Sequence, residues 1–290
     1  MDILVQVVIS GILFGGIYAL VSIGLTLIMG VMDIVNFAHG EYLMVALYTT
    51  YFLNQLWNVD PYVAAIAVIP LFFLFGLLSE RVLIRPTLDK PAFVHVFVTL
   101  GLSIILQNLA LLMFSGNFRS ISVPYAQYSY EIFDILINYP RLVIFIVGIL
   151  VAIGLHFFLH YTWVGKAIRA TAQNKNAALL MGINVQKVYA ITFAIGVSLV
   201  GLGGSLLMPI YSVYPTVGFQ FVLVAFVAVV MGGLGSIKGA VIASFLIGLV
   251  ETLSGFFIDP SVKQALYFTV FIMVLLFRPY GLFGKKTKVA

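Results

Sequence analysis

The sequence predicts an all-α polytopic membrane protein. Of its 290 residues, 62% are hydrophobic and only 9% are charged, and the mean hydropathy is +1.15. A soluble chain of this length needs many more charged residues on its surface, because only lipid lets nearly every face of a helix be apolar. No linker or separate soluble domain interrupts the chain, so we expect residues 1–290 to form a single membrane domain.

Apolar runs of membrane-spanning length predict the number of helices. A hydrocarbon core about 30 Å thick needs roughly 20 apolar residues per helix, which gives about eight or nine segments here. The second and seventh segments contain polar residues or glycines, so either could be a broken or re-entrant helix. The expected segments are residues 3–29, 36–56, 61–84, 94–115, 140–160, 188–210, 219–234, 239–257 and 264–279.

Basic residues collect in three regions, which we expect to be cytoplasmic because positive charge is retained on that side during insertion. In a nine-segment count all three regions fall on one side, with the N-terminus outside and the C-terminus inside. The tyrosine-rich loop at 116–139 is then extracytoplasmic. The basic residues are Arg81, Arg85, Lys90, Lys166, Arg169, Lys175, Lys187, Arg278, Lys285, Lys286 and Lys288.

A polar stretch at residues 163–187 interrupts the apolar chain. It holds four basic residues and no acidic residue. Good helix formers without proline fill 165–181, and Gly182 followed by Ile183 is typical of a helix end, so we expect one cytoplasmic helix roughly 24 Å long over 166–181. Its small side chains favour docking to another protein, whereas the alternative is an amphipathic helix resting on anionic headgroups.

Polar residues inside the apolar spans are candidates for a path or gate, because charges are costly in hydrocarbon. The densest group follows Gly30, where the alternatives are a broken helix lining a path and a solvated cytoplasmic turn. Gln107 and Asn108 lie in the middle of a span, which favours interhelical hydrogen bonding over ligand contact. Glu251 is equally consistent with lining a path and with helix packing or an interfacial position. The candidates are Asp33, Asn36, His39, Glu41, Gln107, Asn108 and Glu251.

The sequence offers little to support catalysis or cofactor binding. It contains no cysteine and no G-x-x-x-x-G-K-[ST] phosphate loop. His156 and His160 have the spacing of half a metal site, but no acid or cysteine lies near them, which favours an interfacial role. We therefore expect no catalytic residue, no cofactor and no metal in this chain, and the net charge of +5 does not indicate a nucleic-acid partner.

Three stretches resemble the permeases of branched-chain amino acid ABC transporters, the LivH type. They read MGVMDIVNFAHGEYLMVALY at 29–48, GKAIRATAQNKNAALLMGINVQKVYAITFAIG at 165–196 and MGGLGSIKGAVIAS at 231–244. Within the second stretch, Asn176, Ala177, Ala178 and Gly182 are similar to the EAA-xxx-G loop through which ABC importer permeases dock onto their ATPases. Asn176 replaces the acidic residue of that loop, so a salt bridge is not expected there.

The resemblance implies a permease subunit in the bacterial cytoplasmic (inner) membrane that moves branched-chain amino acids inward. Its partners would be a second, related permease subunit in a heterodimer, two cytoplasmic ATPase subunits that use ATP and magnesium, and an extracytoplasmic substrate-binding protein. The stretch at 163–187 would be the coupling loop that transmits ATPase closure. Its coupling residues would be Lys166, Arg169, Asn176, Ala177, Ala178 and Gly182.

Other functions remain open from the sequence. The same permease family also serves urea, amides and other amino acids. An ion-coupled secondary transporter would use Asp33, Glu41 or Glu251 as intramembrane carriers. An intramembrane enzyme is the weakest alternative, because no catalytic dyad with credible spacing lies in the spans.

Overall fold

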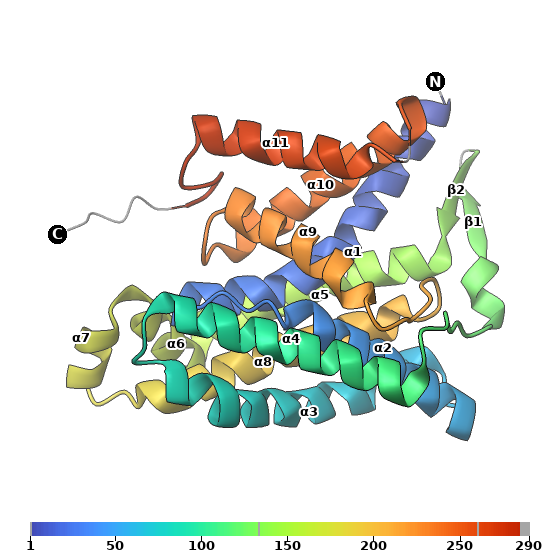
Figure 1. The fold of residues 1–290 in the computed structure, drawn as a ribbon. Helices are drawn as coiled ribbons and strands as arrows, with labels where there is room; N and C mark the ends of the chain where they lie inside the picture. The colour runs from blue at the N-terminus through green and yellow to red at the C-terminus, as the bar shows by residue number, and fades with distance from the viewer. Residues whose placement is uncertain (1, 133, 260, 285–290) are drawn as a thin grey trace.

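The computed structural model describes residues 2–132, 134–259 and 261–284, and in them the chain is a bundle of helices with one small hairpin (Figure 1). A π-helical turn (Glu80–Ile84) and two 3-10 turns (Arg85–Thr87, Pro124–Gln127) complete the elements. The helices are α1 (Asp2–Met32), α2 (His39–Trp57), α3 (Pro61–Ser79), α4 (Ala92–Phe114), α5 (Tyr139–Tyr161), α6 (Trp163–Gln173), α7 (Lys175–Leu180), α8 (Val185–Leu207), α9 (Val217–Gly232), α10 (Ile237–Phe257) and α11 (Lys263–Phe277), and the strands are β1 (Ser129–Ile132) and β2 (Ile135–Asn138).

Each expected membrane segment corresponds to a helix, which confirms the all-α polytopic prediction. Among the described residues, six helices are long and apolar enough to cross a membrane: α1, α3, α4, α5, α8 and α10. α2 has 19 residues but carries the polar group at its start. α9 and α11 are apolar but have only 16 and 15 residues. At 1.5 Å per residue α9 is about 24 Å long, shorter than the hydrocarbon core, as its sequence indicated.

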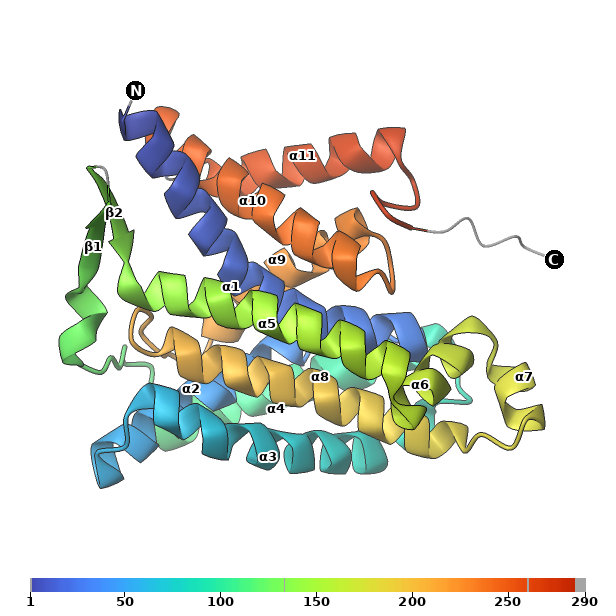
Figure 2. The ribbon, with the colours of Figure 1, turned by 180° about the vertical axis from the view of Figure 1, so that it is seen from behind.

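The basic regions gather at one end of the bundle. α6, α7, the α3–α4 connection and the last turn of α11 lie at that end, and the β1–β2 hairpin and the start of α1 lie at the other (Figures 1 and 2). Lys175 Nζ lies 3.9 Å from Asp89 Oδ1, which joins α7 to the α3–α4 connection. The described basic residues thus share one end, as predicted; Lys285, Lys286 and Lys288 lie outside the described residues.

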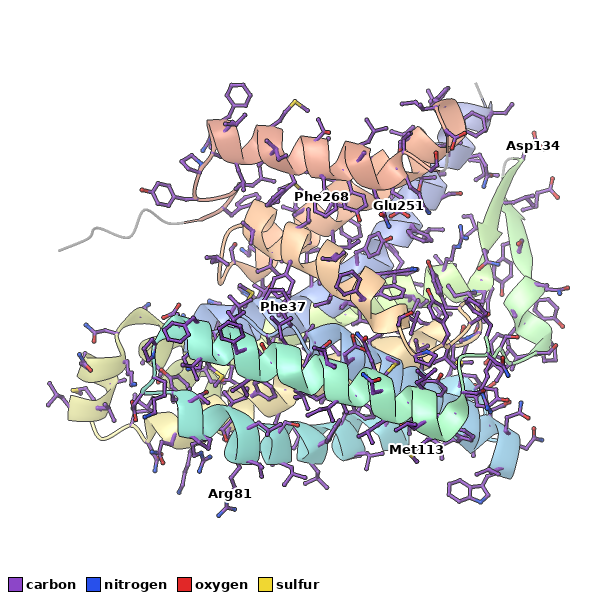
Figure 3. All side chains as sticks on the ribbon, viewed as in Figure 1. Phe37, Arg81, Met113, Asp134, Glu251 and Phe268 are labelled. Atoms are coloured by element: carbon purple, nitrogen blue, oxygen red, sulfur yellow. The ribbon has the colours of Figure 1, made fainter. Side chains whose placement is uncertain are left out.

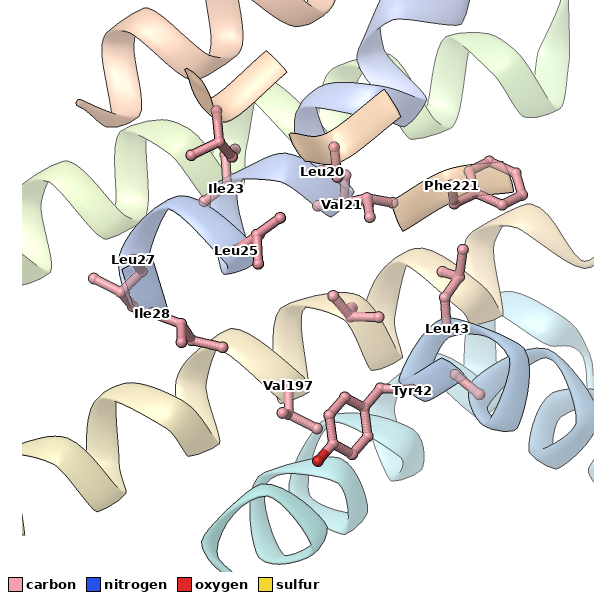
Figure 4. Packing of buried hydrophobic residues seen from close by; sticks show 14 of the residues in the cluster. Leu20, Val21, Ile23, Leu25, Leu27, Ile28, Tyr42, Leu43, Val197 and Phe221 are labelled. Carbon is pink, nitrogen blue, oxygen red and sulfur yellow. The ribbon is translucent and has the colours of Figure 1, made fainter. Parts of the chain in front are cut away.

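The core forms around α1 and α8, which are buried along most of their length, whereas α3, α4 and α5 expose most of theirs. Figure 4 shows Ile28 of α1, Tyr42 of α2, Val197 of α8 and Phe221 of α9 among the side chains that fill the interior. Because lipid tails are as apolar as leucine, close van der Waals packing rather than water exclusion must stabilise such contacts. The exposed apolar faces of α3, α4 and α5 are those expected of helices that meet lipid or another membrane subunit.

Glycines let α1 and α10 cross closely, because small residues allow two helix backbones to approach each other. A Cβ built on Gly15 would lie 2.7 Å from the Cα of Phe245, and one on Gly248 would lie 2.5 Å from the Gly11 carbonyl oxygen. No side chain larger than hydrogen fits at these distances without moving a backbone. The two helices therefore depend on these glycines for their packing.

Two local features differ from the sequence prediction. The single helix expected over 166–181 is wrong, because Asn174 breaks it into α6 and α7 with an extended backbone (φ −159°, ψ 104°). The Asn174 side chain accepts a hydrogen bond from the Ala177 N–H at 2.9 Å, and asparagine is among the strongest N-cap residues. The β1–β2 hairpin inside the loop at 116–139 was also not predicted.

We expect Gly15→Val to destabilise the bundle, because the added methyls would force α1 and α10 apart. Overpacking of this kind costs about 1–3 kcal/mol. The measurement is the thermal unfolding midpoint of the purified protein in detergent. Gly154→Ala is the matched control, since a Cβ at Gly154 in α5 meets nothing within 4 Å. Equal midpoints for both variants would contradict the assigned helix packing.

Candidate functional site

The chain re-enters the bundle after α1 instead of forming a solvated turn. Asp33 has a positive φ of 54° and is exposed, as a cytoplasmic turn residue would be. Asn36, His39 and Glu41 have no exposed surface at all. His39 Nε2 lies 3.1 Å from the Val21 carbonyl oxygen, well inside α1. Asp33 is exposed, as the solvated alternative expects, whereas Asn36, in the α1–α2 connection, and His39 and Glu41, in the first turn of α2, are buried within the protein.

Glu41 links α2 to α4 through neutral hydrogen-bond donors. Its Oε1 accepts hydrogen bonds from Gln107 Nε2 at 2.7 Å and from the Ser103 hydroxyl at 3.2 Å. In the described part of the chain, Glu41 Oε2, His39 Nδ1 and both polar atoms of the Asn36 side chain have no hydrogen-bond partner. Unpaired buried polar atoms are costly, so their presence favours a functional role for this re-entrant segment over a purely stabilising one.

The two neighbouring amides of α4 have different surroundings. Gln107 is half-buried against Glu41 and makes the interhelical hydrogen bond that the sequence favoured. Asn108 donates to the Ile104 carbonyl of its own helix at 2.8 Å and is exposed. Only Gln107 therefore joins the cluster around Glu41, and Asn108 lies on the outer face of α4.

Glu251 belongs to a separate polar cluster near the C-terminal end of α10. The Tyr18 hydroxyl donates a hydrogen bond to Glu251 Oε2 at 2.5 Å, and Lys263 Nζ lies 3.0 Å from Oε1. A cavity of about 260 Å³ opens beside this cluster between α1, α9, α10 and α11. Sequence reasoning missed Tyr18 and Lys263, because their approach to Glu251 depends on how three helices pack.

The polar stretch at 163–187 is tied to the bundle by α6. Arg169 Nε donates to the Leu159 carbonyl at 2.9 Å, so this guanidinium connects α6 to α5. Lys166 is exposed, with its Nζ 5.3 Å from the ring centroid of Trp163. Of the other residues expected to meet a partner, Asn176, Ala177 and Gly182 are exposed, whereas Ala178 is buried within the chain and does not offer the direct contact that was expected of it.

α7 ends in an exposed apolar tip formed by residues 179–181, which was not predicted from the sequence. Leu180 is 90% exposed and Met181 is 82% exposed, and both follow the half-exposed Leu179. Gly182 (φ 79°) ends the helix as predicted, with Gly182 N–H bonded to the Leu179 carbonyl and Ile183 N–H to the Ala178 carbonyl. This pair of bonds is a Schellman motif, which fixes the direction of the tip. The Leu-Leu-Met run before Gly182 was the signal that could have identified it.

The two histidines of α5 lie next to each other. The His156 and His160 ring centroids are 4.1 Å apart, and the rings are tilted by 31°. Within residues 2–132, 134–259 and 261–284, no group of three His, Cys, Asp or Glu side chains could hold a metal ion. The polar clusters around Glu41 and Glu251 and the tip of α7 are therefore the features that a function must explain.

Comparison with known proteins decides the family. Residues 7–275 match the model described as the branched-chain amino acid transport system permease component. The chain belongs to this permease family. It is 34% identical over 295 residues to the high-affinity branched-chain amino acid permease LivH of Salmonella typhimurium, covering 97% of this chain and 95% of that relative. The high-affinity branched-chain amino acid permease BraD of Pseudomonas aeruginosa is 33% identical, again over 97% of this chain and 95% of that relative. No solved structure matches.

A more distant relative shares only part of the permease. The ribose import permease RbsC of Escherichia coli is 33% identical over 115 residues, which is 37% of this chain and 36% of that protein. The permease is thus a multi-pass membrane protein of a transport family, not of an enzyme family.

We expect Gln107→Leu to destabilise the permease by about 1–3 kcal/mol, because it leaves the buried Glu41 carboxylate without its shortest hydrogen bond. The unfolding midpoint in detergent should fall by a few degrees. Asn108→Leu is the control, since it removes only a bond within α4 and should change stability by less than about 0.5 kcal/mol. An equal loss in both variants would show that the Gln107–Glu41 bond does not stabilise the α2–α4 contact.

Proposed function

We propose that the permease moves branched-chain amino acids into the cytoplasm as the membrane subunit of an ABC importer in the bacterial cytoplasmic membrane. The observation that supports this most is the similarity to LivH and BraD over 97% of the chain. The energy source would lie on partner subunits, because the chain has no phosphate-binding loop of its own.

The proposed contact with the ATPase is the apolar tip of α7. Figures 1 and 2 place α7 at the extreme end of the molecule, beyond the apolar helices. This is the end of the bundle where the basic regions gather. An exposed apolar tip in this position is typical of an anchor that inserts into a pocket on another protein. Asn176 and Ala177 lie on the same short helix, and Lys166 lies on α6 beside it.

Arg169 and Ala178 support the same function from inside the chain. Arg169 holds α6 against α5 through the Leu159 carbonyl, and buried Ala178 lets α7 pack on its own subunit. A force applied at the tip of α7 would then reach α5 and α8 through packed contacts. We propose that this force drives a rigid-body transition between outward-open and inward-open states.

The remaining partners complete the proposal. A second, related permease subunit would pair with this chain, and the exposed apolar faces of α3, α4 and α5 offer area for such a contact. An extracytoplasmic substrate-binding protein would dock at the end that carries the β1–β2 hairpin. At that end a hollow of about 550 Å³ is lined by residues of the 116–139 loop, Arg141 and the α8–α9 connection.

The first test is uptake of radiolabelled leucine, isoleucine and valine by cells that express the complete transporter. We expect uptake to stop when ATP is depleted and to survive collapse of the proton gradient. Uptake with the opposite dependence would assign an ion-coupled secondary transporter. Uptake of urea or an amide, with no uptake of the three amino acids, would keep the architecture and overturn the substrate.

The second test is Leu180→Asp in the same cells. A charge in an apolar anchor costs about 2 kcal/mol or more in binding, so ATP-driven uptake should fall roughly thirtyfold. The amount of permease in the membrane should not change, because Leu180 makes no buried contact in this chain. The control is Gln186→Ala, at an exposed position at the start of α8. Full uptake by Leu180→Asp would exclude the α7 tip as the coupling contact.

A further inference from the structure

The cavity beside Glu251 contains both charges that a free amino acid requires. Figure 3 shows Glu251 between α10 and α11, near the end of the bundle that carries the hairpin. The Glu251 carboxylate and the Lys263 ammonium both line the cavity, together with Tyr18 and Tyr267. Its volume of about 260 Å³ suits a small metabolite, since drug-sized ligands occupy roughly 300–1,000 Å³.

The opposite charges in this cavity are poorly explained as a stabilising ion pair. Glu251 is only 8% exposed, so its ionised form has lost most of its hydration. Replacing a buried ion pair by apolar residues is often neutral or stabilising, so such a pair is weak evidence for a role in stability. Lys263 keeps 41% of its side chain exposed, which leaves the ammonium able to move toward a second anion.

The rest of the wall is mixed, because Gln220 and Gln264 line the cavity together with two apolar side chains of α9. Phe221 and Val224 of α9 are almost fully buried and line the same cavity. The Tyr18 and Tyr211 rings lie 6.4 Å and 5.2 Å from the Phe221 ring, measured between centroids, so the aromatic surface is continuous. The cavity therefore combines one anion, one cation, two amides and a smaller apolar surface, which together can hold a zwitterion whose hydrocarbon side chain meets Phe221 and Val224.

We propose that this cavity is a transient binding site for the α-amino acid on its way through the permease, an inference that rests on the proposed function. The Glu251 carboxylate accepts hydrogen bonds from the α-ammonium, and Lys263 donates to the α-carboxylate. Binding exchanges one internal ion pair for two ion pairs to the ligand. The Tyr18 hydroxyl keeps Glu251 oriented, and Phe221 and Val224 contact the side chain of the amino acid.

A tether for α11 is the competing explanation. α11 packs mainly on α10 and α9, and the Lys263–Glu251 pair ties its first turn to α10. A tether would affect the stability of the protein without placing an amino acid in the cavity. The position of a bound amino acid therefore separates the two roles, whereas loss of activity does not.

The experiment is photo-cross-linking with a diazirine analogue of leucine, applied to the complete transporter in lipid nanodiscs with its binding protein. We expect the cross-links in the unchanged protein to map to the cavity segments of α9, α10 and α11 by peptide mass spectrometry. Excess unlabelled leucine should remove them. Cross-links confined to other segments would overturn the proposal, and this result depends on no variant folding correctly.

Two variants then test the charges. Glu251→Gln and Lys263→Gln should each reduce labelling of the cavity roughly tenfold or more, because each leaves a ligand charge unpaired. Lys263→Arg should retain most of the labelling, since it keeps the cation. Thr252→Val is the matched control, because Thr252 bonds the Gly248 carbonyl on α10 and does not line the cavity. A lower unfolding midpoint with undiminished labelling in Glu251→Gln would assign the tether and overturn the site.

Parallel measurements identify which conclusion fails. Normal ATP-driven leucine uptake with labelling outside the cavity would overturn the site and leave the proposed function intact. No uptake of any branched-chain amino acid would overturn both. A zwitterionic lipid headgroup has similar chemistry, so a short-chain phosphatidylethanolamine is added in a separate arm. Labelling displaced by that lipid and not by leucine would assign the cavity to lipid and overturn the amino-acid site.

Discussion

The close crossing of α1 and α10 determines where the other helices lie. Gly11 and Gly15 contact α10 near Leu249 and Phe245, so the two helices run antiparallel with their backbones in contact. Further along α1, Gly24 meets the backbone of Gly196 in α8. α1 thus holds α10 with one half and α8 with the other. Lipid provides no hydrophobic force between helices, so these backbone contacts must bring the two sides of the bundle together.

The same crossing explains how a tyrosine near the start of the chain meets an acid more than two hundred residues later. Side chains lean toward the N-terminus of their own helix, so in an antiparallel pair they lean toward each other's carboxyl-terminal turns. Tyr18 and Glu251 each lie three residues beyond a glycine of the crossing, at Gly15 and Gly248. Glu251 has a cation beside it, whereas Glu41 is held by neutral donors alone.

Hydropathy was sufficient to predict the membrane helices, because each apolar run must satisfy its own backbone hydrogen bonds in lipid. The break at Asn174 was not predicted, since its cap geometry competes with good helix formers on both sides. Gly182 was predictable because few other residues adopt its positive φ. The partners of Glu41 and Glu251 were not predictable, because they come from distant helices and depend on packing that no local pattern encodes.

The extended residue at Asn174 has a mechanical consequence. An unbroken helix behaves as a rod and transmits torque as well as tension from one end to the other. The single extended residue at Asn174 makes α6 and α7 two separate helices that differ in direction. In the coupling role proposed above, a pull on α7 would reach α6 through this one joint, so the direction of the pull need not follow the axis of α6.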